Sequence, residues 1–125
     1  MNSKVLIVDD SALARRTLRQ LLEDQGHTVE DAPDGARALE LFFLHKPELV
    51  VLDMVMNGMY GLEVLEKLRE LDPEVKVIVA TADIQDSTAL QAKAAGAKGI
   101  LNKPINKAQL VAAVERVLGG GETWN

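Results

Sequence analysis

The sequence Leu49-Val50-Val51-Leu52-Asp53 decides the fold, because four consecutive aliphatic residues lead directly to an aspartate. Pro47 stands just before this run, and a loop that contains Gly58 follows it. A short, continuous apolar run of this kind predicts a strand that is buried on both faces, as in a parallel sheet. In open α/β sheets, ligands bind beyond the carboxyl ends of the strands, so Asp53 stands where chemistry is expected.

The overall composition indicates one globular domain of 125 residues, which is close to the commonest domain size. The absence of cysteine excludes disulfides and thiolate metal sites. A net charge of −5, no basic stripe and few aromatic residues argue against binding of nucleic acid. No apolar run approaches the ~20 residues that cross a bilayer, and none forms a signal-peptide core. We therefore expect a cytoplasmic protein that is not bound to a membrane.

Strand patterns alternate with helix patterns five times along the chain. The expected strands are 4–8, 28–32, 49–53, 75–80 and 99–102, and the expected helices are 12–25, 35–45, 61–71, 84–95 and 107–118. This alternation predicts an α/β fold with a parallel sheet, right-handed crossovers and helices on both faces. The strand 28–32 is more polar than the others and is expected at an edge of the sheet.

The first helix is expected to start after Ser11 as N-cap. Leu13, Leu18, Leu21 and Leu22 should form its apolar face, and Arg15, Arg16 and Arg19 its solvated face. The domain is expected to span residues 1–118, followed by a glycine-rich tail at 119–125. The run Gly119-Gly120-Gly121 either begins a linker or ends the last helix, and we favour a helix stop with a frayed end.

Polar side chains follow four of the expected strands. These residues are Asp9 and Asp10, Asp53, Thr81 and Lys103. Because the carboxyl ends of parallel strands meet at one edge, three carboxylates, a hydroxyl and an ammonium should lie together there. For any one of these residues, a polar loop is an equally good explanation. A tendency of loops to be polar does not account for all five residues together.

Three neighbouring carboxylates repel one another unless a cation neutralises them. Oxygen donors without His or Cys favour Mg²⁺ or Mn²⁺. A carboxylate beside such an ion can attack phosphorus and form an acyl phosphate. Lys103 and Thr81 could then hold the other phosphoryl oxygens.

The motifs Val8-Asp9-Asp10, Leu52-Asp53, Ala80-Thr81-Ala82 and Lys103-Pro104 resemble the signature of response-regulator receiver domains of two-component systems. The resemblance covers about Lys4 to Leu118 and is greatest to the chemotaxis-type single-domain regulators. It implies a flavodoxin-like, doubly wound sheet of five strands in the order 2-1-3-4-5.

The resemblance also implies a role for each site residue. Asp53 would accept a phosphoryl group from a phosphohistidine on a sensor kinase or phosphotransfer protein. Mg²⁺ would be held by Asp10, Asp53 and the backbone carbonyl of Val55, with Asp9 contributing directly or through water. Thr81, the backbone of Ala82 and Lys103 would bind the phosphoryl group. The Lys103–Pro104 peptide bond is expected to be cis.

The resemblance further implies that the protein is a switch and not a turnover enzyme. A downstream target would bind the surface formed by the fourth helix, the fifth strand and the last helix. A phosphatase is a further expected partner, and the chain would be a monomer or a phosphorylation-dependent dimer.

Four positions depart from the family pattern. Asn57 follows Met56 where the family usually has proline, which predicts a looser loop. Ile100 stands where the family usually has an aromatic switch residue, so either the loop after Thr81 carries the signal or Ile100 is simply packed. Val55 and Asp83 flank the expected path of a hydrolytic water. Our hypothesis is that these two positions set the lifetime of the phosphorylated state.

Two other functions stay open at this point. An aspartyl-phosphate phosphohydrolase usually has a second Asp two residues after its nucleophile, where this chain has Val55. A pseudo-receiver that signals without phosphorylation would not need all five site residues, yet this chain has them.

Overall fold

The computed structural model describes residues 3–56, 60–82 and 86–124. Five strands and five helices alternate along these residues. The strands are β1 (Lys4–Val8), β2 (Thr28–Ala32), β3 (Leu49–Asp53), β4 (Val77–Thr81) and β5 (Gly99–Asn102). The helices are α1 (Ala12–Asp24), α2 (Gly35–His45), α3 (Gly61–Leu71), α4 (Asp86–Ala94) and α5 (Lys107–Leu118). Among the described residues, no helix is long and apolar enough to span a bilayer.

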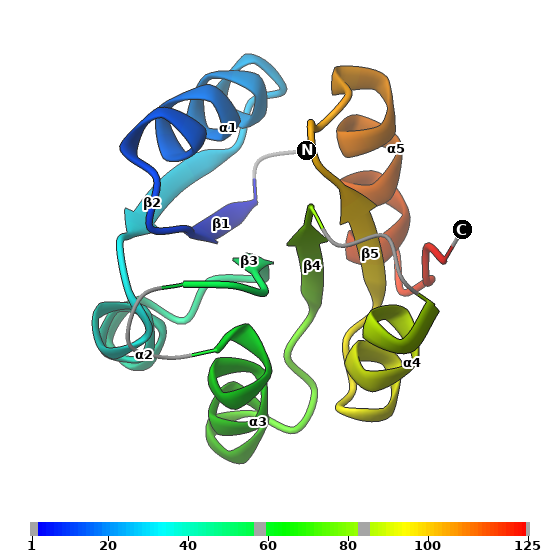
Figure 1. Ribbon diagram of the computed structural model, residues 1–125. Helices are drawn as coiled ribbons and strands as arrows, with labels where there is room; N and C mark the ends of the chain where they lie inside the picture. The colour runs from blue at the N-terminus through cyan, green and yellow to red at the C-terminus, as the bar shows by residue number, and fades with distance from the viewer. Residues whose placement is uncertain (1–2, 57–59, 83–85, 125) are drawn as a thin grey trace.

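The five strands form one parallel sheet in the order β2-β1-β3-β4-β5, which confirms the predicted fold. Helices α1 and α5 cover one face of the sheet, and α2, α3 and α4 cover the other (Figure 1). The polar strand β2 lies at an edge, as its sequence predicted. Such a doubly wound sheet leaves the carboxyl ends of its strands open for a site.

The core consists of two hydrophobic clusters, one on each face of the sheet. The side chains of β3 show how the strands build both, because successive residues point to opposite faces. Val50 and Leu52 pack towards α2 and α3. Leu49 and Val51 pack towards α1 and α5. Burial on both faces explains why this strand has no polar residue before Asp53.

Side-chain caps fix where three helices begin. Ser11 accepts a hydrogen bond from the backbone N–H of Ala14, Asp34 from that of Arg37 and Asn106 from that of Gln109. Each cap satisfies one of the backbone donors that a helix start leaves without a partner. The start of α1 after Ser11, directly beyond Asp9 and Asp10, is as predicted.

Two boundaries and one helix face differ from the sequence prediction. Strand β4 begins at Val77 instead of residue 75, and α4 ends at Ala94 instead of residue 95. The predicted start of α4, at residues 84 and 85, lies outside the described residues. Leu13 was predicted on the buried face of α1 but is 70% exposed. It precedes Leu18 by five residues, which turns it away from the face that Leu18 and Leu22 bury.

The prediction of a fully solvated arginine face on α1 is also wrong. Arg15 donates a hydrogen bond from Nη1 to the carbonyl oxygen of Asp9. Arg19 contacts the carboxylate of Asp31 and the carbonyl oxygen of Val29. These two side chains therefore connect α1 to the end of β1 and to β2, whereas Arg16 is exposed.

The expectation of a frayed end after α5 is wrong for the described residues 119–124, which we call the tail segment. Thr123 pairs in parallel with Gly99 at the outer edge of β5. Trp124 packs against the core cluster that lies under α2, α3 and α4. The glycines end the helix, but the chain then returns to the sheet.

Candidate functional site

The register of the sheet brings the predicted polar residues to one edge. Val8 pairs with Leu52, so Asp9 and Asp10 leave β1 beside the end of β3. Asp53 pairs with Ala80, and Thr81 follows in β4. Thr81 in turn pairs with Asn102, the residue before Lys103. Residues from four separate segments therefore meet where the strands end.

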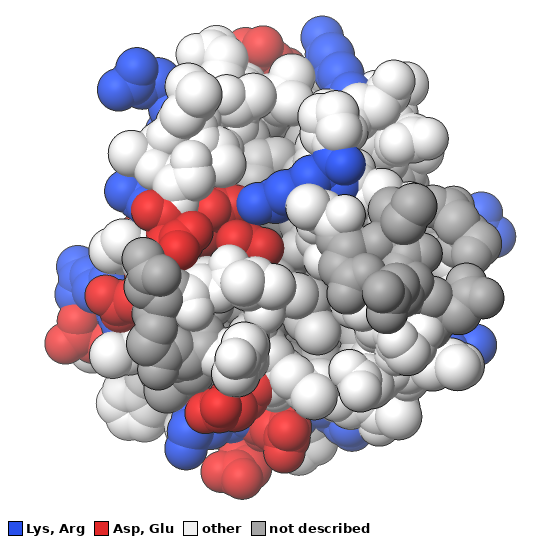
Figure 2. All heavy atoms as spheres, in the orientation of Figure 1, with Lys and Arg blue, Asp and Glu red and all other residues white. Residues whose placement is uncertain are grey.

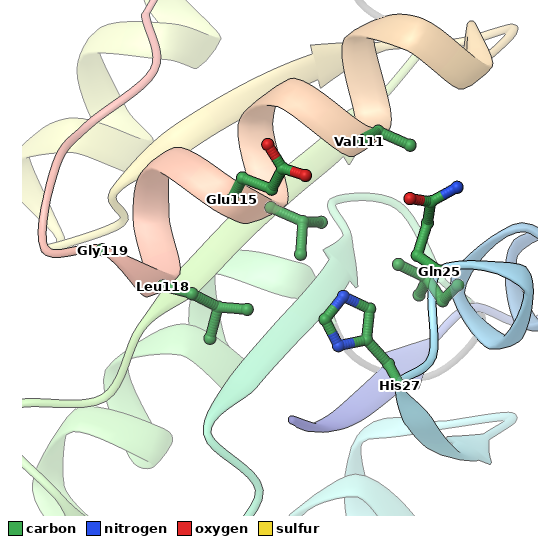
Figure 3. Close-up of a pocket in the computed structure, with 8 residues that line it drawn as sticks. Gln25, His27, Val111, Glu115, Leu118 and Gly119 are labelled. Carbon is green, nitrogen blue, oxygen red and sulfur yellow. The ribbon is translucent and has the colours of Figure 1, made fainter. Parts of the chain in front are cut away.

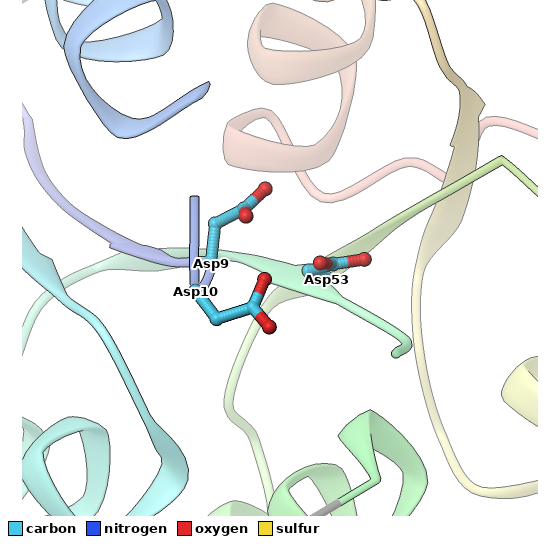
Figure 4. Close-up of side chains that lie close together, drawn as sticks. All are labelled: Asp9, Asp10 and Asp53. Carbon is cyan, nitrogen blue, oxygen red and sulfur yellow. The ribbon is translucent and has the colours of Figure 1, made fainter. Parts of the chain in front are cut away.

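The three aspartates form a compact acidic cluster. One carboxylate oxygen of Asp9, of Asp10 and of Asp53 lies within 4.8 Å of the others. Figure 4 shows these side chains at the neighbouring ends of β1 and β3. Asp9 and Asp53 are buried, whereas Asp10 is exposed. In Figure 2, acidic side chains gather over this part of the sheet, beside a basic side chain.

Asp9 is held in place from three sides. Its Oδ1 accepts a hydrogen bond of 2.9 Å from the backbone N–H of Ser11, the residue that caps α1. Its Oδ2 accepts one of 2.8 Å from Nζ of Lys103. Its backbone carbonyl accepts from Arg15. The carboxylate therefore has a fixed orientation.

Lys103 supplies the positive charge of the site. Its Nζ lies 2.8 Å from Oδ2 of Asp9 and 3.5 Å from Oδ2 of Asp53. Burial alone would lower the pKa of the Lys103 ammonium, but the hydrogen bond to Asp9 and the charges of Asp53 and Asp9 raise it overall. Lys103 therefore stays protonated at neutral pH. The following peptide bond to Pro104 is cis, as the resemblance implied.

The carboxyl group of Asp53 is less easily ionised than an ordinary aspartate. Burial and the neighbouring charge of Asp9 raise its pKa, and Lys103 only partly opposes them. The backbone N–H of Val55 also donates to Oδ1 of Asp53, at 3.3 Å. Val55, whose backbone carbonyl was predicted to bind the metal, therefore contacts the carboxylate of Asp53 directly through its N–H.

Three carboxylates beside one ammonium leave the cluster with excess negative charge when all groups are ionised. This donor set fits a hard divalent cation such as Mg²⁺, which prefers carboxylate oxygen and retains several waters. The exposure of Asp10 leaves room for those waters. Asp9, Asp10 and Asp53 are thus the residues that could hold the ion.

The remaining predicted residues surround this cluster. Thr81 is buried at the end of β4, and its carbonyl accepts a hydrogen bond from the backbone N–H of Lys103. Ala82 follows it and is exposed. Asn57 and Asp83 lie outside the described residues. Ile100 is buried in β5 with 6% of its surface exposed, which agrees with the reading that it is simply packed.

Sequence reasoning missed the role of Gly61 in positioning Asp53. A Cβ at Gly61 would collide with the carbonyl oxygen of Asp53 and lie 2.7 Å from Cα of Met54. The backbone N–H of Gly61 donates to the carbonyl of Met54. The start of α3 thus lies directly against the backbone of the candidate nucleophile. A glycine at the first position of a helix was the only signal in the sequence.

A hollow in the surface lies away from this edge of the sheet. It is lined by the end of α1, by His27 before β2, by α5 from Val111 to Leu118 and by Gly119 after it, and Figure 3 shows these residues. Its lining is mainly apolar and places no cluster of carboxylates together. The chemistry that the sequence predicts therefore belongs to the edge that carries Asp53.

A comparison with protein families agrees with this geometry. The family model for the response regulator receiver domain matches residues 5–115. The chain belongs to the response regulator receiver family. Receiver domains act between a kinase or other phosphodonor and downstream targets, and the acidic cluster of this receiver is the part suited to binding Mg²⁺.

Curated relatives match nearly the whole receiver. This chain is 34% identical over 118 residues to the chemotaxis protein CheY of Halobacterium salinarum, and the match covers 94% of this chain and 98% of the relative. The CheY of Bacillus subtilis is 33% identical over 119 residues, covering 94% and 99%.

Solved structures share the fold. The structure of Vibrio cholerae CheY4 has a TM-score of 0.89 and 31% identity, covering 94% of this chain and 99% of that one. A LuxR-family two-component response regulator from Aurantimonas has a TM-score of 0.93 and 30% identity, covering 98% and 89%.

Proposed function

We propose that this receiver takes a phosphoryl group onto Asp53 from a phosphohistidine of a sensor kinase or phosphotransfer protein. The observation that carries the proposal is the convergence of Asp53 with Asp9, Asp10 and Lys103 at one edge of the sheet. A phosphoryl group placed against Asp53 would meet an ammonium on one side and the acidic pair on the other.

In the proposed reaction, a carboxylate oxygen of Asp53 attacks phosphorus while the bond from phosphorus to the histidine nitrogen breaks. The histidine leaves with that electron pair, and an aspartyl phosphate remains. Asp53 needs no general base because its ionised form is the nucleophile. Bound Mg²⁺ would neutralise charge on the phosphoryl oxygens. Lys103 would stabilise the same charge from the side of β5, and the Thr81 hydroxyl would donate a hydrogen bond to a phosphoryl oxygen.

We further propose that the aspartyl phosphate alters contacts with a downstream protein on the surface of α4, β5 and α5. The receiver would act as a switch that catalyses its own phosphorylation and slow dephosphorylation, and not as a turnover enzyme. The CheY relatives make chemotaxis the first pathway to test. A phosphatase partner, a cytoplasmic location and a monomer or phosphorylation-dependent dimer belong to the same proposal.

Intact mass measurement after incubation with Mg²⁺ and a small phosphodonor tests the reaction. The wild-type chain should gain one phosphoryl group, and Asp53→Asn should gain none. Asp24→Asn, an exposed aspartate at the end of α1, is the matched control and should behave as wild type. A wild-type chain that gains no mass contradicts the proposal and favours the pseudo-receiver. Sustained release of phosphate from a phosphate ester would favour the phosphohydrolase.

A further inference from the structure

The tail segment occupies the outer edge of β5. The backbone N–H of Lys98 donates to Val77 in β4, on the inner side of the strand. The backbone N–H of Ile100 instead donates to the carbonyl of Thr123 at 3.1 Å, and that of Thr123 donates to the carbonyl of Lys98 at 2.9 Å. Thr123 thus satisfies two of the backbone polar groups that an edge strand would otherwise expose, the carbonyl of Lys98 and the N–H of Ile100.

A glycine in β5 makes this close approach possible. A Cβ at Gly99 would collide with Cγ2 of Thr123 and lie 2.8 Å from its carbonyl oxygen. Outside the neighbouring residues, the three heavy atoms nearest to that position all belong to Thr123, so the tail segment is what a side chain at residue 99 would meet first. Glycine weakens a strand interior and often marks the approach of another backbone, as it does here.

Trp124 fastens the segment against α4. Its ring packs on the core cluster of that face, and Nζ of Lys93 in α4 lies 5.6 Å from the ring centroid. Its indole N–H donates to Oε1 of Glu122 at 2.7 Å. The segment therefore presents an extended backbone, a β-branched side chain opposite Gly99 and an aromatic ring beside a lysine.

We propose that the outer edge of β5 is a strand-acceptor site, held in this chain by Glu122–Trp124, at which a downstream partner inserts an extended segment in their place. The partner segment would make the same two main-chain hydrogen bonds and carry an aromatic residue next to a small β-branched one. This inference rests on the proposed function only in assigning the downstream partner to the α4, β5 and α5 surface.

Displacement is feasible because the internal contact is small. It consists of one residue pair with two hydrogen bonds and one half-buried ring that lies beside Lys93. The tail segment has one advantage over a segment of another protein: it is covalently attached to the domain, which gives it a high effective concentration. A partner with a longer extended segment could form more ladder bonds along the same edge.

The first experiment measures whether the tail segment is docked, using Trp124 as the sole tryptophan of the chain. Gly99→Ala in the full chain should shift its fluorescence to the red. It should also speed hydrogen exchange at the Ile100 amide by about tenfold or more, because that amide loses its partner. Gly119→Ala, whose added Cβ meets only carbonyls of its own helix, is the matched control and should change neither signal. Wild-type signals in Gly99→Ala contradict the docked segment.

The second experiment tests the acceptor site with a peptide of the sequence Gly-Gly-Glu-Thr-Trp-Asn. The full chain with Thr123→Pro and Trp124→Ala loses the internal contact and should bind this peptide about tenfold more tightly than wild type. Amide chemical-shift changes should centre on Lys98 to Ile100. Adding Gly99→Ala to the same variant, or scrambling the peptide, should abolish them.

The acceptor site would be overturned if the peptide bound the wild type and the double variant equally well. It would also be overturned if the amide chemical-shift changes lay outside β5 and Lys98. Far-UV circular dichroism and a cooperative thermal unfolding transition of the same variants, compared with wild type, show that they are folded. Because the binding assay contains no phosphodonor, a negative result in it leaves phosphorylation at Asp53 untouched. Conversely, a chain that gains no phosphoryl group can still bind the peptide.

Discussion

Nζ of Lys103 lies 2.8 Å from Oδ2 of Asp9, so the residue after β5 is tied to the residue after β1 across the open edge of the sheet. Asp9 is buried, and this ammonium forms an ion pair with its carboxylate. The contact holds the site together before any phosphoryl group is bound.

Replacing Lys103 with methionine should destabilise the metal-free protein at neutral pH. The buried Asp9 carboxylate would lose its partner, and the three carboxylates would repel one another. Because Lys103 is itself one-quarter exposed, we expect a loss on the order of 1–3 kcal/mol in urea unfolding, below the cost of breaking a fully buried pair. Mg²⁺ should restore part of the loss. Lys107→Met, at an exposed position, is the control, and equal stability of the two variants would contradict the role of the pair.

Asp53→Asn should stabilise the metal-free protein at neutral pH. Burial and Asp9 raise the pKa of Asp53 in the folded state. A carboxyl with a raised pKa favours folding while protonated, and this contribution is lost as the pH rises through the folded-state pKa. Removing the charge should therefore raise the free energy of unfolding by about 1 kcal/mol and the melting temperature by a few degrees. The gain should shrink in acid, where both side chains are neutral. A gain that is absent at neutral pH, measured with a chelator present, would disprove this account.

Mg²⁺ should raise the melting temperature through the acidic cluster. A ligand that binds only the folded state at 100 times its Kd adds about 2.7 kcal/mol. Asp10→Asn removes the exposed carboxylate of the cluster, so a higher Mg²⁺ concentration should be needed for the same shift. Asp24→Asn should titrate as wild type. A shift that Asp10→Asn leaves unchanged would place the ion elsewhere.

Gly61→Ala should impair both folding and phosphorylation. The added methyl group meets backbone atoms of Asp53 and Met54, which cannot rotate away. We expect a loss of about 1–3 kcal/mol in thermal unfolding. The phosphorylation rate should fall by about tenfold or more, because the nucleophile is displaced. Gly119→Ala is again the matched control. Normal phosphorylation in Gly61→Ala would show that the close approach is not needed to position Asp53.

Val55→Asn and Asp83→Ala should change the lifetime of the phosphorylated state. Val55 is 63% exposed and its backbone contacts Asp53, so its side chain stands where water reaches the site. An asparagine there could hydrogen-bond to the phosphoryl group or to that water. Loss of the phosphoryl group can be followed over time by intact mass. Rates within about twofold of wild type for both variants would refute the hypothesis.

The sequence by itself determined the layered fold and the members of the site. Apolar runs of about five residues that end in polar residues are a local signal, and the parallel arrangement brings all such ends to one edge. Ser11 was recognisable as a helix cap for the same reason, since a cap acts within three residues. The order of the strands came from the resemblance and not from these patterns.

Only the tertiary structure decided which side chains touch. Whether Lys103 contacts Asp9 or Asp53 more closely depends on a few ångströms across three strands, which no local pattern encodes. Arg15 looked solvated because its partner, the carbonyl of Asp9, is a backbone atom with no sequence signature. The tail segment looked frayed because the partners of Thr123, the carbonyl of Lys98 and the N–H of Ile100, are also backbone groups that lie far from it in the chain. Hydrophobic periodicity reports burial of side chains, whereas main-chain pairing at an edge appears only when the sheet is assembled.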